Sequence, residues 1–150
     1  MHIAVMSGSE GSIAVLIAAG ANLDIPDASG QSPIFHCCEA GHVALAEAFI
    51  AAKADLAIAD VDERTPLHWS TVGGHVETTS ALLRAGAAIN AVDKEGKSPL
   101  IYAAYQGHAA TVDALIAMGA DLDVQDSEGI SAVHWAALQN HAQVGSLYKI

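Results

Sequence analysis

The chain has 150 residues, which allows one compact domain or one short stack of repeats. Its 17 acidic and 6 basic side chains give a formal net charge of −11. This balance argues against nucleic acid or an anionic membrane as the main partner, because phosphate contacts need lysine and arginine. The two cysteines, Cys37 and Cys38, are neighbours and cannot cross-link distant segments, so a reducing compartment is expected.

The amino-terminal residues lack both the basic start and the long apolar run of a signal peptide. The apolar stretch at residues 13–21 is far too short to span a bilayer. We therefore expect a cytoplasmic or nuclear protein that is not secreted and does not insert into a membrane.

Several residue types recur in phase along the chain, at steps of 33 residues. The recurring slots hold aspartate (Asp27, Asp60, Asp93, Asp126), serine or threonine (Ser32, Thr65, Ser98, Ser131), histidine (His42, His75, His108, His141) and glycine (Gly8, Gly41, Gly74, Gly107, with Asn140 in the last place). The register never slips, so the sequence predicts a tandem repeat without insertions.

Each unit predicts two helices and an extended connection. Serine or threonine before proline starts a first helix, since the hydroxyl can cap the helix and proline suits its first position; the clearest copy spans roughly Pro66 to Val72. A glycine, or Asn140 in the last unit, then ends this helix in the left-handed conformation. Apolar residues at helical spacing form a second helix. The second helices end at Gly20, Lys53, Gly86 and Gly119.

We predict one all-α domain over residues 1–150. It comprises a partial first repeat (1–26), full repeats at 27–59, 60–92 and 93–125, and a nearly full, cap-like last repeat (126–150). His2 falls in a first-helix slot, so the chain is expected to be a fragment of a longer protein or to carry a trimmed amino-terminal cap. Lys149 in a core slot and Ala132 in the proline slot indicate a cap, because terminal repeats need a solvated outer face.

The clearest unit contains Thr65-Pro66-Leu67-His68, then Gly74-His75 and Gly86-Ala87. This order resembles the ankyrin-repeat family, although Glu63 takes the place of a glycine in the extended segment. The resemblance implies a solenoid of helix-turn-helix units with finger loops. It also implies a protein-protein interaction module or scaffold that binds its partner on the concave face of finger tips and first helices.

Carried onto this chain, the resemblance places partner binding on the variable finger and first-helix positions: Arg64, Val72, Lys94, Glu95, Lys97, Tyr105, Gln106, Glu128, Leu138 and Gln139. Three of these are half of all the basic residues, and Val72, Tyr105 and Leu138 are apolar where a monomer would leave them exposed. The alternative is that they are ordinary solvated side chains. We expect a monomer that binds another protein.

Eight histidines raise the question of a metal site. Equivalent atoms of stacked repeats lie about 8–10 Å apart, whereas zinc holds its ligands within about 2 Å. The four histidines in equivalent slots are therefore expected to bond backbone groups, and His68 and His134 to tie adjacent repeats together. Cys37 and Cys38 are predicted to be small buried hydrophobes. We expect no metal, no cofactor, no catalytic residue and no enzymatic activity.

Two further features leave alternatives open. The aromatic stripe, which comprises His36, Trp69, Tyr102 and Trp135, either packs neighbouring units together or lines the binding groove. Asn90 resembles the site that asparaginyl hydroxylases modify in ankyrin repeats, or it is a turn asparagine that bonds its own backbone. The alternative functions are therefore a substrate of hydroxylation at Asn90 and a targeting arm of a larger multidomain enzyme, transferase or channel.

Overall fold

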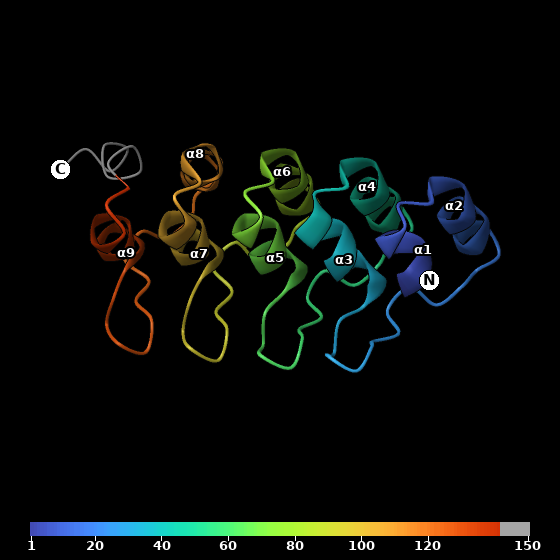
Figure 1. Cartoon of the computed structure of the whole chain (residues 1–150), viewed down its shortest axis with the longest axis horizontal. Coiled ribbons are helices and arrows are strands. Elements are labelled where there is room, and N and C mark those ends of the chain that lie inside the picture. Colours follow the sequence, from blue (N-terminus) through green and yellow to red (C-terminus); the bar gives the residue numbers. More distant parts are fainter. Residues whose placement is uncertain (142–150) are drawn as a thin grey trace.

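The computed structural model describes residues 1–141, and its helices form two parallel rows, with long loops projecting beside one of them (Figure 1). The row of first helices comprises α1 (His2–Met6), α3 (Pro33–Ala40), α5 (Pro66–Val72), α7 (Pro99–Gln106) and α9 (Ala132–Leu138). The row of second helices comprises α2 (Glu10–Ala18), α4 (Val43–Ala51), α6 (Val76–Arg84) and α8 (Ala109–Ala117). In the first four units each first helix packs against its second helix, and equivalent helices of neighbouring units pack together up to α9, as a linear stack requires.

The first helices begin at the serine or threonine slot, as predicted, but the hydroxyls are bonded differently from unit to unit. Thr65 and Ser131 form capping boxes with the histidine three residues later. In Ser98 the hydroxyl oxygen accepts the N–H of Ile101 at 3.3 Å. The predicted cap is wrong for Ser32, whose buried hydroxyl has no hydrogen-bond partner within the described residues.

The glycine slot after α3, α5 and α7 has two physical requirements. Gly41 has φ +70°, which an ordinary side chain rarely adopts. A Cβ atom there would also lie 2.4 Å from the ring of His75, which belongs to the next unit. Glycine and histidine therefore recur in phase because the histidine of one unit packs on the glycine of the unit before it.

Three residues other than glycine occupy the left-handed conformation among residues 1–141: Lys53 (φ 65°), Glu63 (φ 64°) and Asn140 (φ 58°). Lys53 and Asn140 confirm that their slots keep the backbone geometry without glycine. Glu63 lies in the finger slot that is Gly30 and Gly96 in neighbouring units, both with positive φ. The departure from the repeat at Glu63 is thus a site of backbone strain.

Replacing Glu63 by glycine is expected to raise the free energy of unfolding by about 0.5–1 kcal/mol. The left-handed penalty of about 1–2 kcal/mol is relieved, while glycine adds entropy to the unfolded chain. Urea unfolding of the wild type and Glu63→Gly would measure the difference, and a lower stability of the variant would contradict the assignment of strain.

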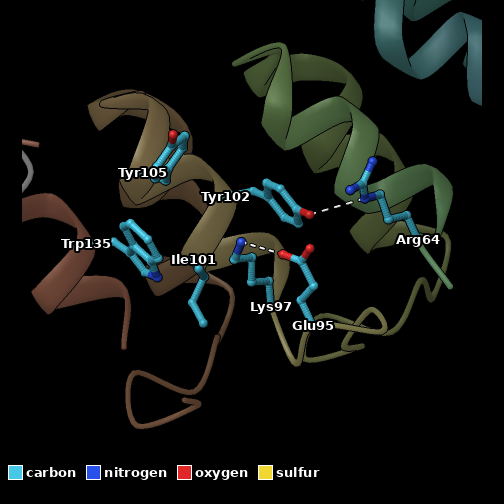
Figure 2. Close-up of a pocket in the computed structure, with 7 residues that line it drawn as sticks. All are labelled: Arg64, Glu95, Lys97, Ile101, Tyr102, Tyr105 and Trp135. Carbon is cyan, nitrogen blue, oxygen red and sulfur yellow. Dashed lines mark hydrogen bonds and ion pairs between the residues drawn. The ribbon is translucent and has the colours of Figure 1, made fainter. Parts of the chain in front are cut away.

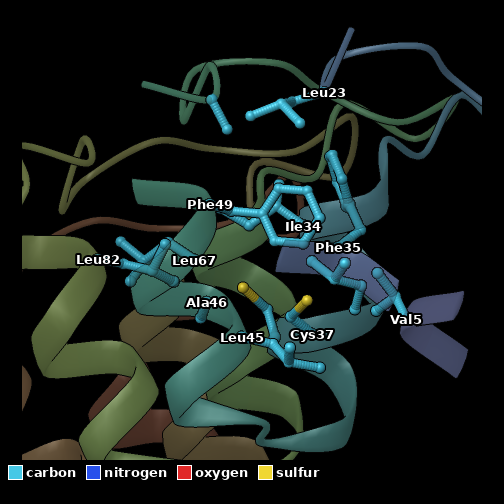
Figure 3. Packing of buried hydrophobic residues seen from close by; sticks show 13 residues of the cluster. Val5, Leu23, Ile34, Phe35, Cys37, Leu45, Ala46, Phe49, Leu67 and Leu82 are labelled. Atoms are coloured by element: carbon cyan, nitrogen blue, oxygen red, sulfur yellow. The ribbon is translucent and has the colours of Figure 1, made fainter. Parts of the chain in front are cut away.

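The buried core consists of two clusters, of which Figure 3 shows the first. One cluster lies among the first three helix pairs and includes Phe35, Phe49 and Leu82; the other lies among α7, α8 and α9. Partly buried Leu83 packs against both clusters. Cys37 and Cys38 are fully buried, and burial raises the pKa of the Cys37 thiol to about 12, so the prediction of buried small hydrophobes is confirmed.

Within the described residues, no helix combines the length and the apolar character needed to cross a bilayer. The structural role predicted for Lys149 concerns a residue outside the described range.

Candidate functional site

Each finger is held to its own first helix by one carboxylate. In the third full unit, Asp93 Oδ1 accepts the N–H groups of Glu95 and Lys97, both at 2.9 Å. The other oxygen, Oδ2, accepts the hydroxyl of Tyr102 on α7 at 2.6 Å. Asp27, Asp60 and Asp126 also accept two finger N–H groups and contact the first helix. The recurring aspartate therefore sets both the shape of the finger and its position.

The residues of the aromatic stripe are the first-helix partners of the finger aspartates. Trp69 Nε1 donates to Asp60 at 3.0 Å, and Trp135 Nε1 donates to Asp126 at 2.7 Å. His36 Nε2 lies 3.2 Å from Asp27 in the same arrangement. The stripe side chains are partly buried, and these contacts fasten the fingers to the first helices.

Basic side chains lie between the aromatic rings of neighbouring units. Arg64 Nε donates to the Tyr102 hydroxyl at 3.1 Å and lies 3.6 Å from Asp93. Its guanidinium carbon is 5.6 Å from the ring centre of Trp69 and 5.6 Å from that of Tyr102. Such cation–aromatic contacts are worth about 0.5–2 kcal/mol. Arg64 was predicted as a finger residue that binds a partner, and the structure shows that it also joins two repeats.

Lys97 repeats this arrangement one unit further along. Its Nζ donates to Glu95 at 2.6 Å and lies 5.5 Å from the ring centre of Trp135. Trp135 in turn meets Tyr105 edge to face, with 5.1 Å between ring centres. The half-buried cations are thus held in fixed positions instead of extending freely into solvent.

These contacts surround a cavity of about 180 Å³ between the fingers and the first helices (Figure 2). Its lining residues are Arg64, Glu95, Lys97, Ile101, Tyr102, Tyr105 and Trp135. Small-molecule and cofactor sites usually occupy about 300–1,000 Å³. The cavity is therefore smaller than a usual small-molecule or cofactor site. We name this cavity, with its seven lining residues, the inter-finger pocket.

Four of the ten predicted partner-binding residues line the inter-finger pocket: Arg64, Glu95, Lys97 and Tyr105. Lys94, Gln106, Glu128, Leu138 and Gln139 are exposed on the same fingers and first helices, but do not line it. Val72 was expected to be exposed and is half-buried; its carbonyl accepts a hydrogen bond from His108 Nε2. Sequence reasoning did not assign Ile101 to the site, although it fills the slot that holds His68 one unit earlier.

Three of the four histidines in equivalent slots bond backbone groups, as predicted, whereas the His42 ring makes no such bond within residues 1–141. His75, His108 and His141 bond through Nε2 to carbonyls 36 residues earlier, at 2.9–3.0 Å. Buried His68 accepts the N–H of Thr65 through Nδ1 at 3.0 Å and bonds the Lys97 carbonyl of the next unit through Nε2 at 3.2 Å. The predicted tie between repeats is confirmed for His68.

The stability of the folded chain is expected to depend on pH through His68 and Asp93. Burial lowers the pKa of His68, against the hydrogen bond to Lys97 and the charge of Asp93. Burial alone would raise the pKa of Asp93, but hydrogen bonds from Tyr102 and two finger N–H groups outweigh it and lower that pKa. In both cases the unfolded chain binds protons more readily than the folded chain, so stability is lost as pH falls.

We expect a decline in two stages. The first starts below the ordinary histidine pKa of 6.5, where unfolded His68 is protonated before folded His68. The second starts below the ordinary aspartate pKa of 3.8, as the Asp93 carboxylate loses its charge. Urea unfolding between about pH 7.5 and pH 3 would measure both. A His68→Ala variant should lose part of the first stage, and equal slopes in the two proteins would contradict the assignment.

Asn90 is exposed, and its side-chain oxygen accepts the N–H of Asp121 at 2.9 Å. Asp24 makes the same contact with Asp55 two units earlier. The alternative that Asn90 bonds its own backbone is therefore replaced by a bond to the following unit.

Stacked helix pairs, fastened unit to unit by histidines and carrying fingers anchored on aspartates, define a helical-repeat solenoid with one extended face. A sequence model of ankyrin repeats (three copies) matches residues 1–93 and 81–147. The chain belongs to the ankyrin-repeat family, whose members are generally protein-protein interaction modules. A search of the curated proteins finds no match to this sequence.

Proposed function

We propose that this chain binds another protein on the face formed by its finger tips and first helices, with the inter-finger pocket at the centre. The observation that carries the proposal is the pocket itself, where predicted contact residues from separate units converge around aromatic walls. Aromatic residues and arginine are the usual anchors of protein interfaces. Ankyrin repeats are generally interaction modules and typically not enzymes.

Two exposed apolar side chains extend the proposed surface beyond the pocket. Tyr105 is 41% exposed and forms one wall of the pocket, and Leu138 is 65% exposed at the end of α9. Both lie on first helices, Tyr105 on α7 and Leu138 on α9. We propose that a partner buries both side chains and inserts one of its own into the inter-finger pocket, against Tyr105 and Trp135.

Affinity capture with the whole chain as bait tests the proposal. Tyr105→Ala and Leu138→Ala are expected to weaken capture of the wild-type partner by about fivefold or more each, because anchor residues cost more than about 1 kcal/mol on truncation. Val15→Ala and Met118→Ala are matched controls, since both side chains are exposed but belong to the second-helix side. Circular dichroism would confirm unchanged helicity. Equal capture by all four variants would contradict the proposed face.

Asn90 supports a second candidate role, because it is exposed at the surface of a finger. We propose that this exposed side chain is a substrate of asparaginyl hydroxylation. Incubation with an asparaginyl hydroxylase followed by intact-mass measurement should show the gain of one oxygen atom, and its absence would remove this role.

The hypothesis that the stack is a targeting arm of a larger enzyme, transferase or channel is tested by reading the gene on both sides of the coding segment.

A further inference from the structure

Three side chains from different repeat slots meet at the first unit boundary. His2 lies on α1, Asp27 at the start of the next finger, and His36 on α3. One ring nitrogen of each histidine and one carboxylate oxygen of Asp27 all lie within 4.8 Å of one another. The sequence led us to expect no metal anywhere in the chain, on the ground that equivalent slots of stacked repeats lie too far apart. That spacing does not apply to residues from three different slots.

Repetition explains why the other described unit boundaries do not reproduce this group. His68 occupies the slot of His2 and meets Tyr102 edge to face, with 6.0 Å between ring centres. His2 meets His36 in the same way at 5.6 Å. The partner ring at the first boundary is thus an imidazole instead of a phenol, which adds a second ligand nitrogen.

The carboxylate of Asp27 is fixed in place with one oxygen available. Oδ1 accepts the N–H groups of Ser29 and Gln31 at 2.8 Å and 3.1 Å. Oδ2 lies 3.2 Å from His36 Nε2. Ligand bonds of about 2.0–2.1 Å in tetrahedral zinc separate neighbouring ligand atoms by about 3.3 Å. The Asp27 and His36 atoms already have this spacing.

The ring of His2 is also held by the neighbouring unit. Its Nε2 lies 2.9 Å from the Gln31 carbonyl oxygen, which keeps the imidazole beside His36. All three side chains are partly buried, so an ion could enter from solvent without local unfolding. The ligand atoms of the three side chains are at most 4.8 Å apart, so only small side-chain movements would bring them all to an ion.

We propose that His2, Asp27 and His36 form a binding site for a divalent transition-metal ion, with Zn²⁺ as the best match and water completing the coordination. Two imidazoles and one carboxylate suit zinc and its neighbours, whereas magnesium and calcium prefer oxygen ligands. His36 coordinates through Nε2 as the neutral tautomer with its proton on Nδ1, so the metal replaces the hydrogen bond to Asp27. The ion joins α1 to the finger and helix of the next unit and stabilises that end of the stack.

Isothermal titration and thermal unfolding of the tag-free chain with Zn²⁺ and with Mg²⁺ test the site at about pH 7.5, where histidine is mostly neutral. His36→Trp is the informative variant, because Trp69 and Trp135 fill the same slot and donate to their aspartates. It keeps the finger anchor and removes a ligand. His42→Gln is the control, since His42 is exposed and lies outside the cluster.

We expect one Zn²⁺ per chain and a higher midpoint of thermal unfolding for the wild type and His42→Gln, with no effect of Mg²⁺. Zinc affinity of His36→Trp should fall by at least about tenfold. NMR of the imidazole protons should show zinc-dependent shifts for His2 and His36. The proposal is overturned if the wild type does not bind, if His36→Trp binds equally well, or if the shifts fall on other histidines.

Discussion

Replacing Asp93 by alanine is expected to lower the free energy of unfolding by about 3 kcal/mol, the lower end of the range for removing one member of a buried ion pair. The Asp93 side chain is only 1% exposed and accepts hydrogen bonds from both finger N–H groups and from Tyr102. Alanine would leave these donors without their acceptor and would also remove the ion partner of Arg64. The finger would then lose its attachment to α7.

Asp123→Ala provides the control for Asp93→Ala. Asp123 is also a finger aspartate, but it is exposed, and its substitution should change the free energy by less than about 0.5 kcal/mol. Urea unfolding followed by circular dichroism measures both values. Similar losses in the two variants would show that the loss comes from general surface charge and not from the anchor.

His68→Ala is expected to destabilise the protein by about 2–4 kcal/mol. The substitution opens a cavity at a fully buried position, removes the capping bond to Thr65 and takes away one of the two donors to the Lys97 carbonyl, which keeps the Asp93 N–H. A cap is worth about 1 kcal/mol and a lost hydrogen bond about 0.5–1.5 kcal/mol, and the cavity adds to both. Since Lys97 belongs to the next unit, the loss weakens the joint between repeats as well as the helix.

The matched control is His42→Ala, which removes an exposed histidine from another repeat slot and should have an effect within about 0.5 kcal/mol. Hydrogen exchange adds a spatial readout, because amides of α5 and α7 should lose protection in His68→Ala. If exchange were unchanged there while global stability fell, the inter-repeat role of His68 would be wrong.

The repeated positions made most of the fold predictable. Glycine, or a residue able to replace it, marked each turn, and Lys53 and Asn140 keep the left-handed backbone that the register requires. Thr65 and Pro66 located the start of α5 correctly. These features are local, so a single sequence contains them.

The candidate site was less predictable because it depends on contacts between units. Arg64 is 38 residues from Tyr102, and nothing in the finger sequence shows that its guanidinium turns back to that hydroxyl. The cluster of His2, Asp27 and His36 was missed for the same reason, since it combines three slots that the period treats separately. Variable positions suggested which residues face a partner, but not which of them lie side by side.

Each finger aspartate binds both its finger and its first helix, and this has a consequence for the binding and release of the partner proposed above. Because Asp93 binds the finger with one oxygen and Tyr102 with the other, the loop is ordered before any partner arrives. Binding then loses little conformational entropy in the fingers, which is the main benefit of a preorganised surface. We expect substitutions on this face to alter the lifetime of a complex more than the rate at which it forms.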